Sequence, residues 1–472
     1  MSTPFLVSVK CPECGGPLQY PEGAYTFKCP YCGSVLRIKK NGVDLKYIIP
    51  SRIPNKNELH LIIKKALCDK KAPSQREPEP MSINKINTIF KPFWYFKGML
   101  YYNHASKTEN DTLAKTWYYS FQANPDFAGT LSSLSVRAEV LTLQPYDKET
   151  IKRMGVALPL LLDKEQAFRY AESAADMSFQ CEAGHALYKR LHFIGEHFFI
   201  IYYPVLQVIC SGTNRDRTFL IDGIGKTLLE HKAGKAKTTP EGYKEEDFHH
   251  IELLSHRCKN CGYDLDAKDF DIVFYCNVCQ RLWLLKNGEY HDLKIKVLDA
   301  KEHKNCVYIP FWRFEVHISS KEAGLDMKTI HDLSTFMKMG RFLLRNEDPE
   351  RPIRLYVPAL VTRNARALLK LATRINMHQR ALPVSQNGNF PIDKILNASL
   401  TEDEAEEMLR VIVFSVIGRQ DRKALDFYRD FTIDVTKKEL LWYPFEDKGN
   451  FLVDNFHQYN FPKQSMDINV YS

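Results

Sequence analysis

Eight of the twelve cysteines in this 472-residue chain form two copies of one spacing pattern. Each copy has two Cys-x-x-Cys pairs separated by fourteen residues. In such a pair both sulfurs lie on one side of a tight turn, so two turns joined by a hairpin offer four thiolates at the corners of a tetrahedron. The pattern therefore predicts two four-cysteine metal sites, formed by Cys11, Cys14, Cys29 and Cys32 and by Cys258, Cys261, Cys276 and Cys279.

Glycine follows three of the four pairs, at Gly15, Gly33 and Gly262. It supplies the backbone freedom that turns of this kind often use. Gln280 follows the fourth pair and departs from the pattern. The second site is therefore the less regular of the two.

At these cysteines the chain resembles the zinc-ribbon superfamily, whose members carry two Cys-x-x-Cys turns on a β-hairpin. The resemblance covers residues 9–40 and 255–286 and implies one structural Zn²⁺ per ribbon, because four thiolates leave no coordination position open. Three alternatives are disfavoured. A reducing compartment disfavours disulfides, a thioredoxin-like redox pair needs only one Cys-x-x-Cys, and iron sites of the rubredoxin type commonly have a longer separation.

Other motifs recur in the same order in both halves of the chain. Pro-Phe-Trp-x-Phe occupies 92–96 and 310–314, and an apolar strand ending in Asn-Gly occupies 36–42 and 282–288. Tyr-Pro at 203–204 and 443–444 precedes Phe-Leu-x-Asp at 219–222 and 451–454, and 136–143 loosely matches 353–360. We interpret the chain as an internally duplicated α+β protein. Each half is a zinc-ribbon β-hairpin followed by an aromatic-rich mixed sheet domain with a helical insertion.

This interpretation divides the chain into five parts, consistent with a length of about three folding units. They are a first ribbon (1–45), a first module (46–229), a linker (230–250), a second ribbon (251–290) and a second module (291–472). Helices are expected over 57–68, 164–175, 365–375 and 402–417. Thr401 with Glu404 forms a capping box that marks the start of the last one. A second linker is expected over 69–80.

Two groups of residues are candidates for partner binding. Trp94 and Trp312, in the repeated aromatic motif, could stack on nucleobases, although such residues are more often the core of a sheet. Arg363, Arg366, Lys370 and Arg374 have spacings of 3, 4 and 4, so they fall along one helix face. That face could bind phosphate groups, pair with the acidic segment 402–407, or be solvated.

Charge and motifs limit the function. The formal net charge is +8, and residues 1–250 carry most of the surplus with 33 basic and 26 acidic side chains. There is no apolar run of membrane-spanning length, no secretory leader pattern and no recognisable catalytic motif. We therefore expect a cytoplasmic, non-enzymatic zinc-binding scaffold or adaptor for protein partners. One alternative is a nucleic-acid-binding protein that uses the basic first ribbon and the 363–374 face. Another is an enzyme with a site between the modules. No small-molecule ligand can be assigned.

Overall fold

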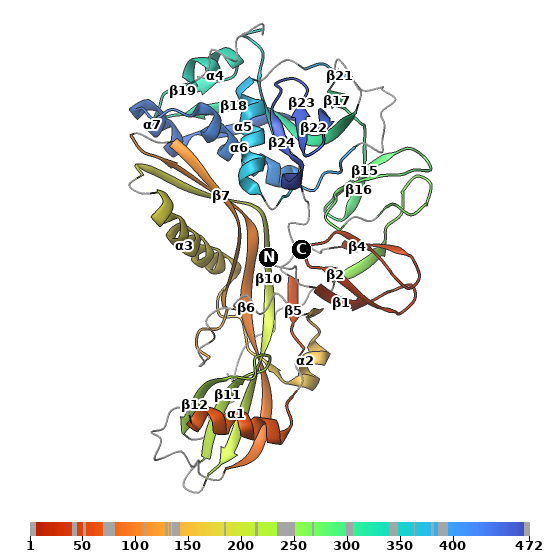
Figure 1. Ribbon diagram of the computed structural model, residues 1–472, viewed down its shortest axis with the longest axis vertical. Coiled ribbons are helices and arrows are strands. Elements are labelled where there is room, and N and C mark those ends of the chain that lie inside the picture. The colour runs from red at the N-terminus through yellow and green to blue at the C-terminus, as the bar shows by residue number, and fades with distance from the viewer. Residues whose placement is uncertain are drawn as a thin grey trace.

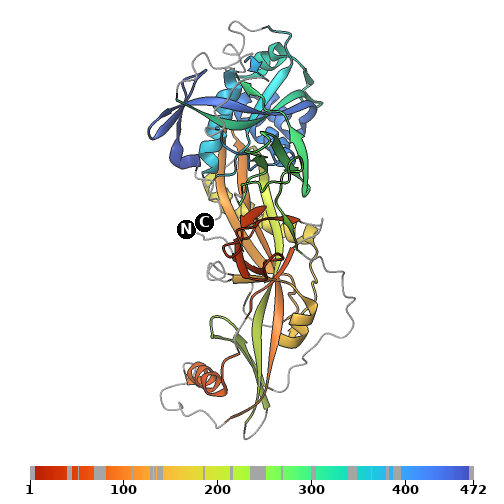
Figure 2. The ribbon, with the colours of Figure 1, turned by 90° about the vertical axis from the view of Figure 1, so that its right-hand side faces the viewer.

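The computed structural model describes residues 6–466 apart from several internal segments. The segments outside the description are 40–44, 51–52, 69–80, 108–109, 128–130, 132–133, 135–141, 184–185, 213–215, 234–250, 267–268, 299–304, 339–347, 363, 379–381 and 386–394. The described part is a mixed α/β protein. It is elongated, with the second half of the chain at one end and a narrow extension of the first half at the other (Figures 1 and 2).

Two antiparallel strands of 24 residues each, β6 and β10, form the spine of the first half. Both strands are rich in aromatic residues and isoleucine, which favour extended structure. The ten-stranded sheet built on them contains β1 (Leu6–Lys10), β2 (Pro17–Pro21), β5 (Leu45–Ile48), β6 (Ser82–Ala105), β7 (Asn110–Gln122), β8 (Thr142–Pro145), β9 (Val156–Ala157), β10 (Tyr188–Ser211), β11 (Asp216–Asp222) and β12 (Leu228–Ala233).

The second half has an eight-stranded sheet built on the antiparallel pair β18 and β22. Its strands are β17 (Val297–Leu298), β18 (Cys306–Ser320), β19 (Leu325–Met327), β20 (Ile353–Pro358), β21 (Val384–Ser385), β22 (Thr432–Lys448), β23 (Phe451–Asp454) and β24 (Asn460–Pro462). Two three-stranded sheets lie beside the cysteine turns, whose first pair joins β1 to β2 of the large sheet. They are formed by β3 (Thr26–Lys28), β4 (Val35–Lys39) and β13 (Glu252–Ser255), and by β14 (Val273–Tyr275), β15 (Leu282–Lys286) and β16 (Glu289–Leu293).

The spine pairs of the two halves have the same register. Trp94 lies opposite Ile200, and Trp312 lies opposite Leu440. Ile200 and Leu440 each precede the Tyr of the Tyr-Pro motif by three residues. The hairpins that follow Tyr203 and Tyr443 also agree, because the turn of each one begins at a buried Asp. Asp222 accepts from the backbone N–H of Gly225 at 2.8 Å, and Asp454 accepts from that of His457 at 3.1 Å.

The neighbouring strands agree as well, but not as the sequence match of 136–143 with 353–360 predicts. β20 pairs with β18 beside the aromatic motif, and the strand in that place in the first half is β7. Ala123, directly after β7, donates to Pro92 O, as Ala359 after β20 donates to Pro310 O. Most of 136–143 lies outside the described residues, and its end forms β8 beside β5. The predicted match of 136–143 with 353–360 is therefore wrong, because β7 and not β8 lies beside the aromatic strand as β20 does.

The described residues contain seven α-helices. They are α1 (Lys56–Cys68), α2 (Lys148–Met154), α3 (Lys164–Ala183), α4 (Ile330–Phe336), α5 (Ala365–His378), α6 (Glu402–Ile417) and α7 (Arg422–Asp430). All four predicted helices are present, and α6 begins at the predicted capping box of Thr401 and Glu404. The sequence did not predict α2, α4 and α7. Residues 230–233 of the predicted linker belong to β12, and the linker at 69–80 lies outside the described residues.

A helix packs on each of the two sheets. α3 packs on β6 with Ala171 and Phe179 against Leu100 and Tyr102, and α6 contributes Leu409 and Phe414 to the core of the second half. The ends of β6 and β10 enter that same core, which joins the halves. At the other end, α1 covers β11 and β12 in a separate small core (Figure 1).

Candidate metal centres

The four Cys-x-x-Cys turns have one backbone geometry. In each turn, the N–H of the residue after the second cysteine donates to the carbonyl of the first cysteine, at 2.8–3.0 Å. The N–H of the first cysteine donates to the carbonyl of the residue two positions after the second cysteine, at 2.8–2.9 Å. These two bonds close a tight loop that directs both sulfurs to one side. Such a turn needs a left-handed residue after the second cysteine.

Three glycines and one glutamine occupy that left-handed position. The φ angles are +72° at Gly15, +76° at Gly33, +75° at Gly262 and +57° at Gln280. Gln280 therefore adopts the conformation of the three glycines, so the fourth turn keeps the shape from which its sequence appeared to depart. Its side chain costs conformational energy there, because a Cβ disfavours the left-handed region.

The turns bring the predicted sulfurs together in both clusters. In the first cluster, Cys11 Sγ lies 3.8 Å from Cys32 Sγ, and Cys14 Sγ lies 3.8 Å from Cys29 Sγ. The corresponding distances in the second cluster are 3.5 Å and 3.4 Å. All four sulfurs of each cluster lie within 4.8 Å of one another. A tetrahedral site with metal–sulfur bonds of about 2.3 Å places its sulfurs about 3.8 Å apart. Each cluster could therefore hold one metal ion.

The thiols of the first cluster have divergent proton affinities. A hydrogen bond with the Ser34 side chain lowers the pKa of Cys32 to about 6. The backbone N–H of Gly16 favours the Cys14 thiolate, but burial and the three neighbouring thiols outweigh it and raise the pKa of Cys14 to about 12. Four sulfurs this close cannot all be ionised unless a cation offsets their repulsion.

The second cluster shows the same divergence and has an additional donor. Burial opposes ionisation of Cys258, but backbone N–H groups, the Cys279 thiol and the indole of Trp283 lower its pKa to about 6. Trp283 Nε1–H donates to Cys258 Sγ at 3.2 Å. The pKa of Cys261 rises to about 12, because burial and the neighbouring thiols outweigh the Tyr263 N–H. The Trp283 indole would orient the Cys258 thiolate without itself being a metal ligand.

The two cysteine clusters are parts of one assembly. β13 leads into the second cluster but pairs antiparallel with β4 of the first, with Ser255 opposite Leu36. The N–H of His256 continues this pairing by donating to Val35 O at 2.9 Å, and Tyr25 N–H donates to Asp269 O at 2.5 Å. The Arg37 guanidinium lies over the Tyr290 ring, 4.9 Å from its centroid. Figure 1 shows the two cysteine-bearing hairpins side by side.

The predicted Asn-Gly turn is present in the second cluster. Asn287 and Gly288 have φ angles of +51° and +76° and join β15 to β16, with Lys286 opposite Glu289. Two successive left-handed residues define the turn type that matches the twist of a hairpin. The corresponding residues 41–42 of the first cluster lie outside the described residues.

Trp94 and Trp312 are core residues, with exposed fractions of 2% and 3%. The indole of Trp94 donates to Leu162 O at 2.9 Å, and that of Trp312 donates to Leu400 O at 2.9 Å. Each acceptor directly precedes the N-cap of a helix, α3 or α6. Enclosed rings with satisfied N–H groups offer no face to a nucleobase, so the stacking platform predicted as the weaker alternative is not formed by these residues.

The predicted basic stripe lies on α5. Arg363 is outside the described residues, while Arg366, Lys370 and Arg374 are exposed and line one groove of about 390 Å³ beside Asp111. Among the described residues, none of these three cations pairs with a carboxylate. The acidic start of α6 pairs elsewhere, since Glu402 contacts Lys438 at 2.5 Å and Lys286 at 3.3 Å. The stripe therefore faces solvent and not the acidic helix.

Sequence reasoning did not find a third set of residues. Arg190 and His192 of β10 and Arg410 of α6 line one cavity between the two halves. They share no local motif, and only the packing of α6 on β10 brings them together. Within the described residues, no helix combines the length and apolarity needed to cross a membrane.

No family model, no curated protein and no solved structure matches the chain.

Proposed function

We propose that the protein is a non-enzymatic scaffold, in which two zinc ribbons brace a surface that binds partner proteins. Zinc is the metal of this proposal, because four thiolates in a tetrahedral arrangement are its usual structural site. Four cysteine ligands per ion leave no position for water or substrate, so the metal would stabilise the fold and carry no chemistry. A reducing compartment such as the cytoplasm fits, since all eight thiols must stay reduced.

The observation that carries this proposal is the strand pairing between the two cysteine clusters. Through β4 and β13 the clusters form one unit, and its metal-bearing loops present three apolar side chains. Tyr31, Tyr263 and Val278 are 65%, 63% and 55% exposed. Each lies within or directly beside a Cys-x-x-Cys turn, so a bound metal would hold it in place. Preorganised aromatic and apolar side chains favour protein binding, because little side-chain entropy is then lost on association.

We also propose that the two halves are copies of one α+β module. Shared strand order, shared register at the two tryptophans and the two equivalent indole hydrogen bonds support this. A duplicated unit without a catalytic set suits a protein that positions partners. Protein partners are the expectation of this proposal, and no small-molecule ligand is needed for it.

Capture experiments with surface variants test the scaffold proposal. Tagged full-length protein with Tyr31→Ala, Tyr263→Ala and Val278→Ala combined should retain its metal and its melting temperature, because these side chains are exposed. It should lose the partner proteins that the natural chain captures from native lysate. Tyr170→Ala, which removes an exposed aromatic of α3, is the matched control and should retain them. Identical capture by all three proteins would contradict the assignment of the ribbon surface.

Nucleic-acid binding is a second candidate, favoured by one observation. Arg366, Lys370 and Arg374 have no carboxylate partner among the described residues, so they are available to phosphate groups. Binding of random DNA and RNA should then weaken steeply with salt, because each phosphate contact releases about one counterion. Loss of this binding in Arg366→Gln with Arg374→Gln would favour the second candidate over the first.

A further inference from the structure

A cavity of about 780 Å³ lies where the two halves meet. α3 and β10 of the first half form two of its walls, and α6 of the second half forms the third. A β-bulge in β10 between Ile194 and His197 marks this place, and Gly195 in the bulge has a φ of +63°. Bulges often occur beside functional sites, where they redirect side chains.

Four cations line this cavity, of which Arg169 and Lys189 are exposed and the other two are half-buried arginines. Arg410 is half-buried, and its guanidinium is fixed, because Nη1 donates to Phe431 O at 2.8 Å and the group lies 5.3 Å from the Phe431 ring centroid. Arg190 is also half-buried. Within the described residues no carboxylate forms an ion pair with either arginine, although Glu407 lines the same cavity.

The two guanidiniums generate a positive potential in the cavity. Burial and then Arg190 lower the pKa of Arg410. Burial, Arg190 and Arg410 together lower the pKa of His192 to about 3, so its ring is neutral at pH 7. The Asn103 amide is oriented by Thr112, which donates to its oxygen at 2.9 Å, and its nitrogen lies 3.2 Å from His192 Nε2. His192 Nε2 is therefore the acceptor, and Nδ1 carries the ring proton.

We propose that this cavity binds an oxyanion group, phosphate or carboxylate, of a small molecule, with Arg190 and Arg410 as its receptors. Two like charges held half-buried are costly without a counter-ion, and a bound oxyanion would offset that cost. The planar fork of each guanidinium matches the geometry of both oxyanions. The cavity volume of about 780 Å³ is in the range of sites that enclose a small molecule. The ligand is therefore a small one.

Titration of the metal-loaded full-length protein tests this proposal. Inorganic phosphate and succinate are added separately at pH 7 in low chloride, and binding is followed by calorimetry. At least one of the two should bind, and Arg190→Gln should weaken that binding at least tenfold. Arg190 is the better residue to change, because Arg410 also anchors Phe431. Arg169→Gln, which removes a cation from the α3 wall of the same cavity, should bind within twofold of the natural protein.

Thermal unfolding provides a second readout that a folding defect would not reproduce. Without an oxyanion, Arg190→Gln should melt no lower than the natural protein, because a repulsion has been removed. At an oxyanion concentration that just saturates the natural protein, Arg169→Gln should gain as much stability as the natural protein, and Arg190→Gln should gain clearly less. Three outcomes would overturn the proposal: no binding of either anion, unchanged binding in Arg190→Gln, or binding that is lost in Arg366→Gln instead. None of these residues belongs to a cysteine cluster, so such a failure leaves the scaffold proposal intact.

Discussion

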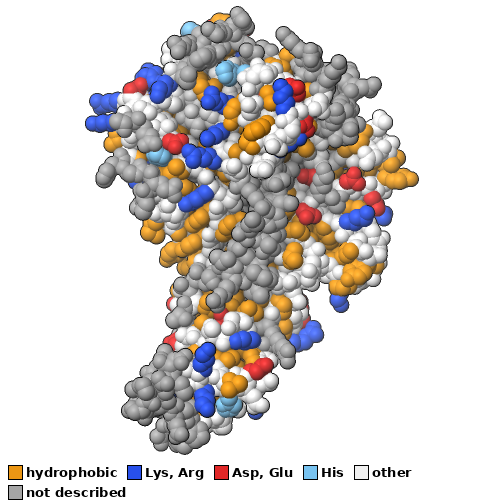
Figure 3. Space-filling model, in the orientation of Figure 1, with side chains coloured by type: hydrophobic (Ala, Val, Ile, Leu, Met, Phe, Trp, Pro, Cys, Tyr) orange, Lys and Arg blue, Asp and Glu red, His pale blue; other side chains and the backbone are white. Residues whose placement is uncertain are grey.

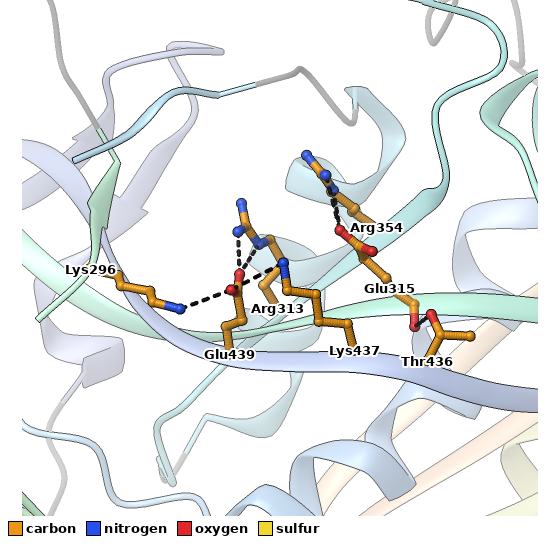
Figure 4. A network of polar contacts seen from close by, with 7 residues as sticks. All are labelled: Lys296, Arg313, Glu315, Arg354, Thr436, Lys437 and Glu439. Carbon is orange, nitrogen blue, oxygen red and sulfur yellow. Dashed lines mark hydrogen bonds and ion pairs between the residues drawn. The ribbon is translucent and has the colours of Figure 1, made fainter. Parts of the chain in front are cut away.

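Arg313 and Glu439 lie directly opposite one another in the β18–β22 pair and form an ion pair there. Lys296 joins from β17's side with its Nζ 2.9 Å from the same carboxylate (Figure 4). At the same position of the Pro-Phe-Trp-x-Phe motif in the first half, Tyr95 lies opposite Phe199, with ring centroids 4.9 Å apart. One register thus supports an aromatic contact in one half and a charged one in the other.

Replacement of Glu439 by Gln should destabilise the second half by about 2 kcal/mol. The arginine, only 8% exposed, would lose its partner, and an unpaired charge of this kind costs up to about 3–5 kcal/mol when fully buried. Lys437→Gln is the control, because that lysine is 54% exposed and should cost less than about 0.5 kcal/mol. Urea unfolding measures both. Equal effects of the two changes would mean that the pair is screened by solvent.

The double replacement Arg313→Tyr with Glu439→Phe should cost less than Glu439→Gln alone. It installs the residues that the first half carries at the same register, and exchange of a buried ion pair for packed apolar groups is often neutral or stabilising. The residual change in unfolding free energy should stay below about 1.5 kcal/mol. A loss as large as that of Glu439→Gln would show that the two sheets pack differently at this position.

The two tryptophan hydrogen bonds predict matched effects. Trp94→Phe and Trp312→Phe should each cost about 2 kcal/mol, because each leaves a buried carbonyl without its donor. Trp117→Phe is a suitable control, since Trp117 is only half-buried and stacks on Tyr119. Denaturant unfolding provides the comparison. Costs that differ by more than about 2 kcal/mol between Trp94 and Trp312 would argue against equivalent packing in the two halves.

Features that depend on nearby residues could be predicted from the sequence. The Cys-x-x-Cys spacing is sufficient to bring four sulfurs together, and the capping box at Thr401 is sufficient to start α6. Burial of the two tryptophans follows from their place in an aromatic strand. The α5 stripe was located correctly, but its surroundings depend on which lysines pair with Glu402, and that is decided by tertiary packing.

Features that depend on contacts between distant segments could not be predicted. The pairing of β13 with β4 joins residues from opposite halves, and nothing in either strand identifies its partner. The cavity with Arg190 and Arg410 depends on α6 packing against β10. The match of 136–143 with 353–360 failed because short apolar strands resemble one another, so hydrophobic pattern alone does not identify the equivalent strand.

Gln280→Gly should stabilise the second cysteine cluster. A non-glycine residue at a φ of +57° pays about 1 kcal/mol, and part of the gain is offset by the greater freedom of glycine in the unfolded chain. We expect a net gain of about 0.5 kcal/mol in thermal unfolding of the metal-loaded protein. Gly262→Ala should lower the melting temperature, because the φ of +75° at this position disfavours any residue with a Cβ. No atom lies within 4 Å of the added Cβ. The loss would therefore be conformational and not steric.

Metal analysis should find about two zinc equivalents per chain in protein purified without added zinc. Cys29→Ser should leave one, because three thiolates and a hydroxyl bind zinc far less tightly than four thiolates. Metal binding contributes of order 10 kcal/mol to folding in small zinc units, so residues 9–40 should lose protection from proteolysis. This cluster shares a hydrophobic core with β6 and β10, in which Cys11 and Cys29 lie with Phe93 and Phe199. That core should therefore lose stability, while the two long strands should still unfold cooperatively. Retention of two zinc ions in Cys29→Ser would remove that cysteine from the ligand set.

Acid should destabilise the protein through His192 before it affects the carboxylates. Its pKa is about 3 in the folded protein and about 6.5 in an unfolded chain, so between these values the unfolded state binds the extra proton. Stability is therefore intact above pH 6.5 and falls as the pH drops towards 3, at up to about 1.4 kcal/mol per pH unit. Because the ring lines an open cavity, we expect a loss of about 1–2 kcal/mol between pH 6.5 and 4.5. His192→Gln should remove only that residue's share of the loss, since glutamine can still accept from Asn103 and does not titrate. His256, whose pKa burial lowers to about 4, titrates over the same range and would supply the rest. His331→Gln, at an exposed position, should leave the profile unchanged.

A steep loss that persists in His192→Gln would place the acid-sensitive group elsewhere. A loss that begins only near pH 4.5 would instead implicate Glu439, whose pKa the lysine and arginine beside it lower to about 2 against the opposing effect of burial.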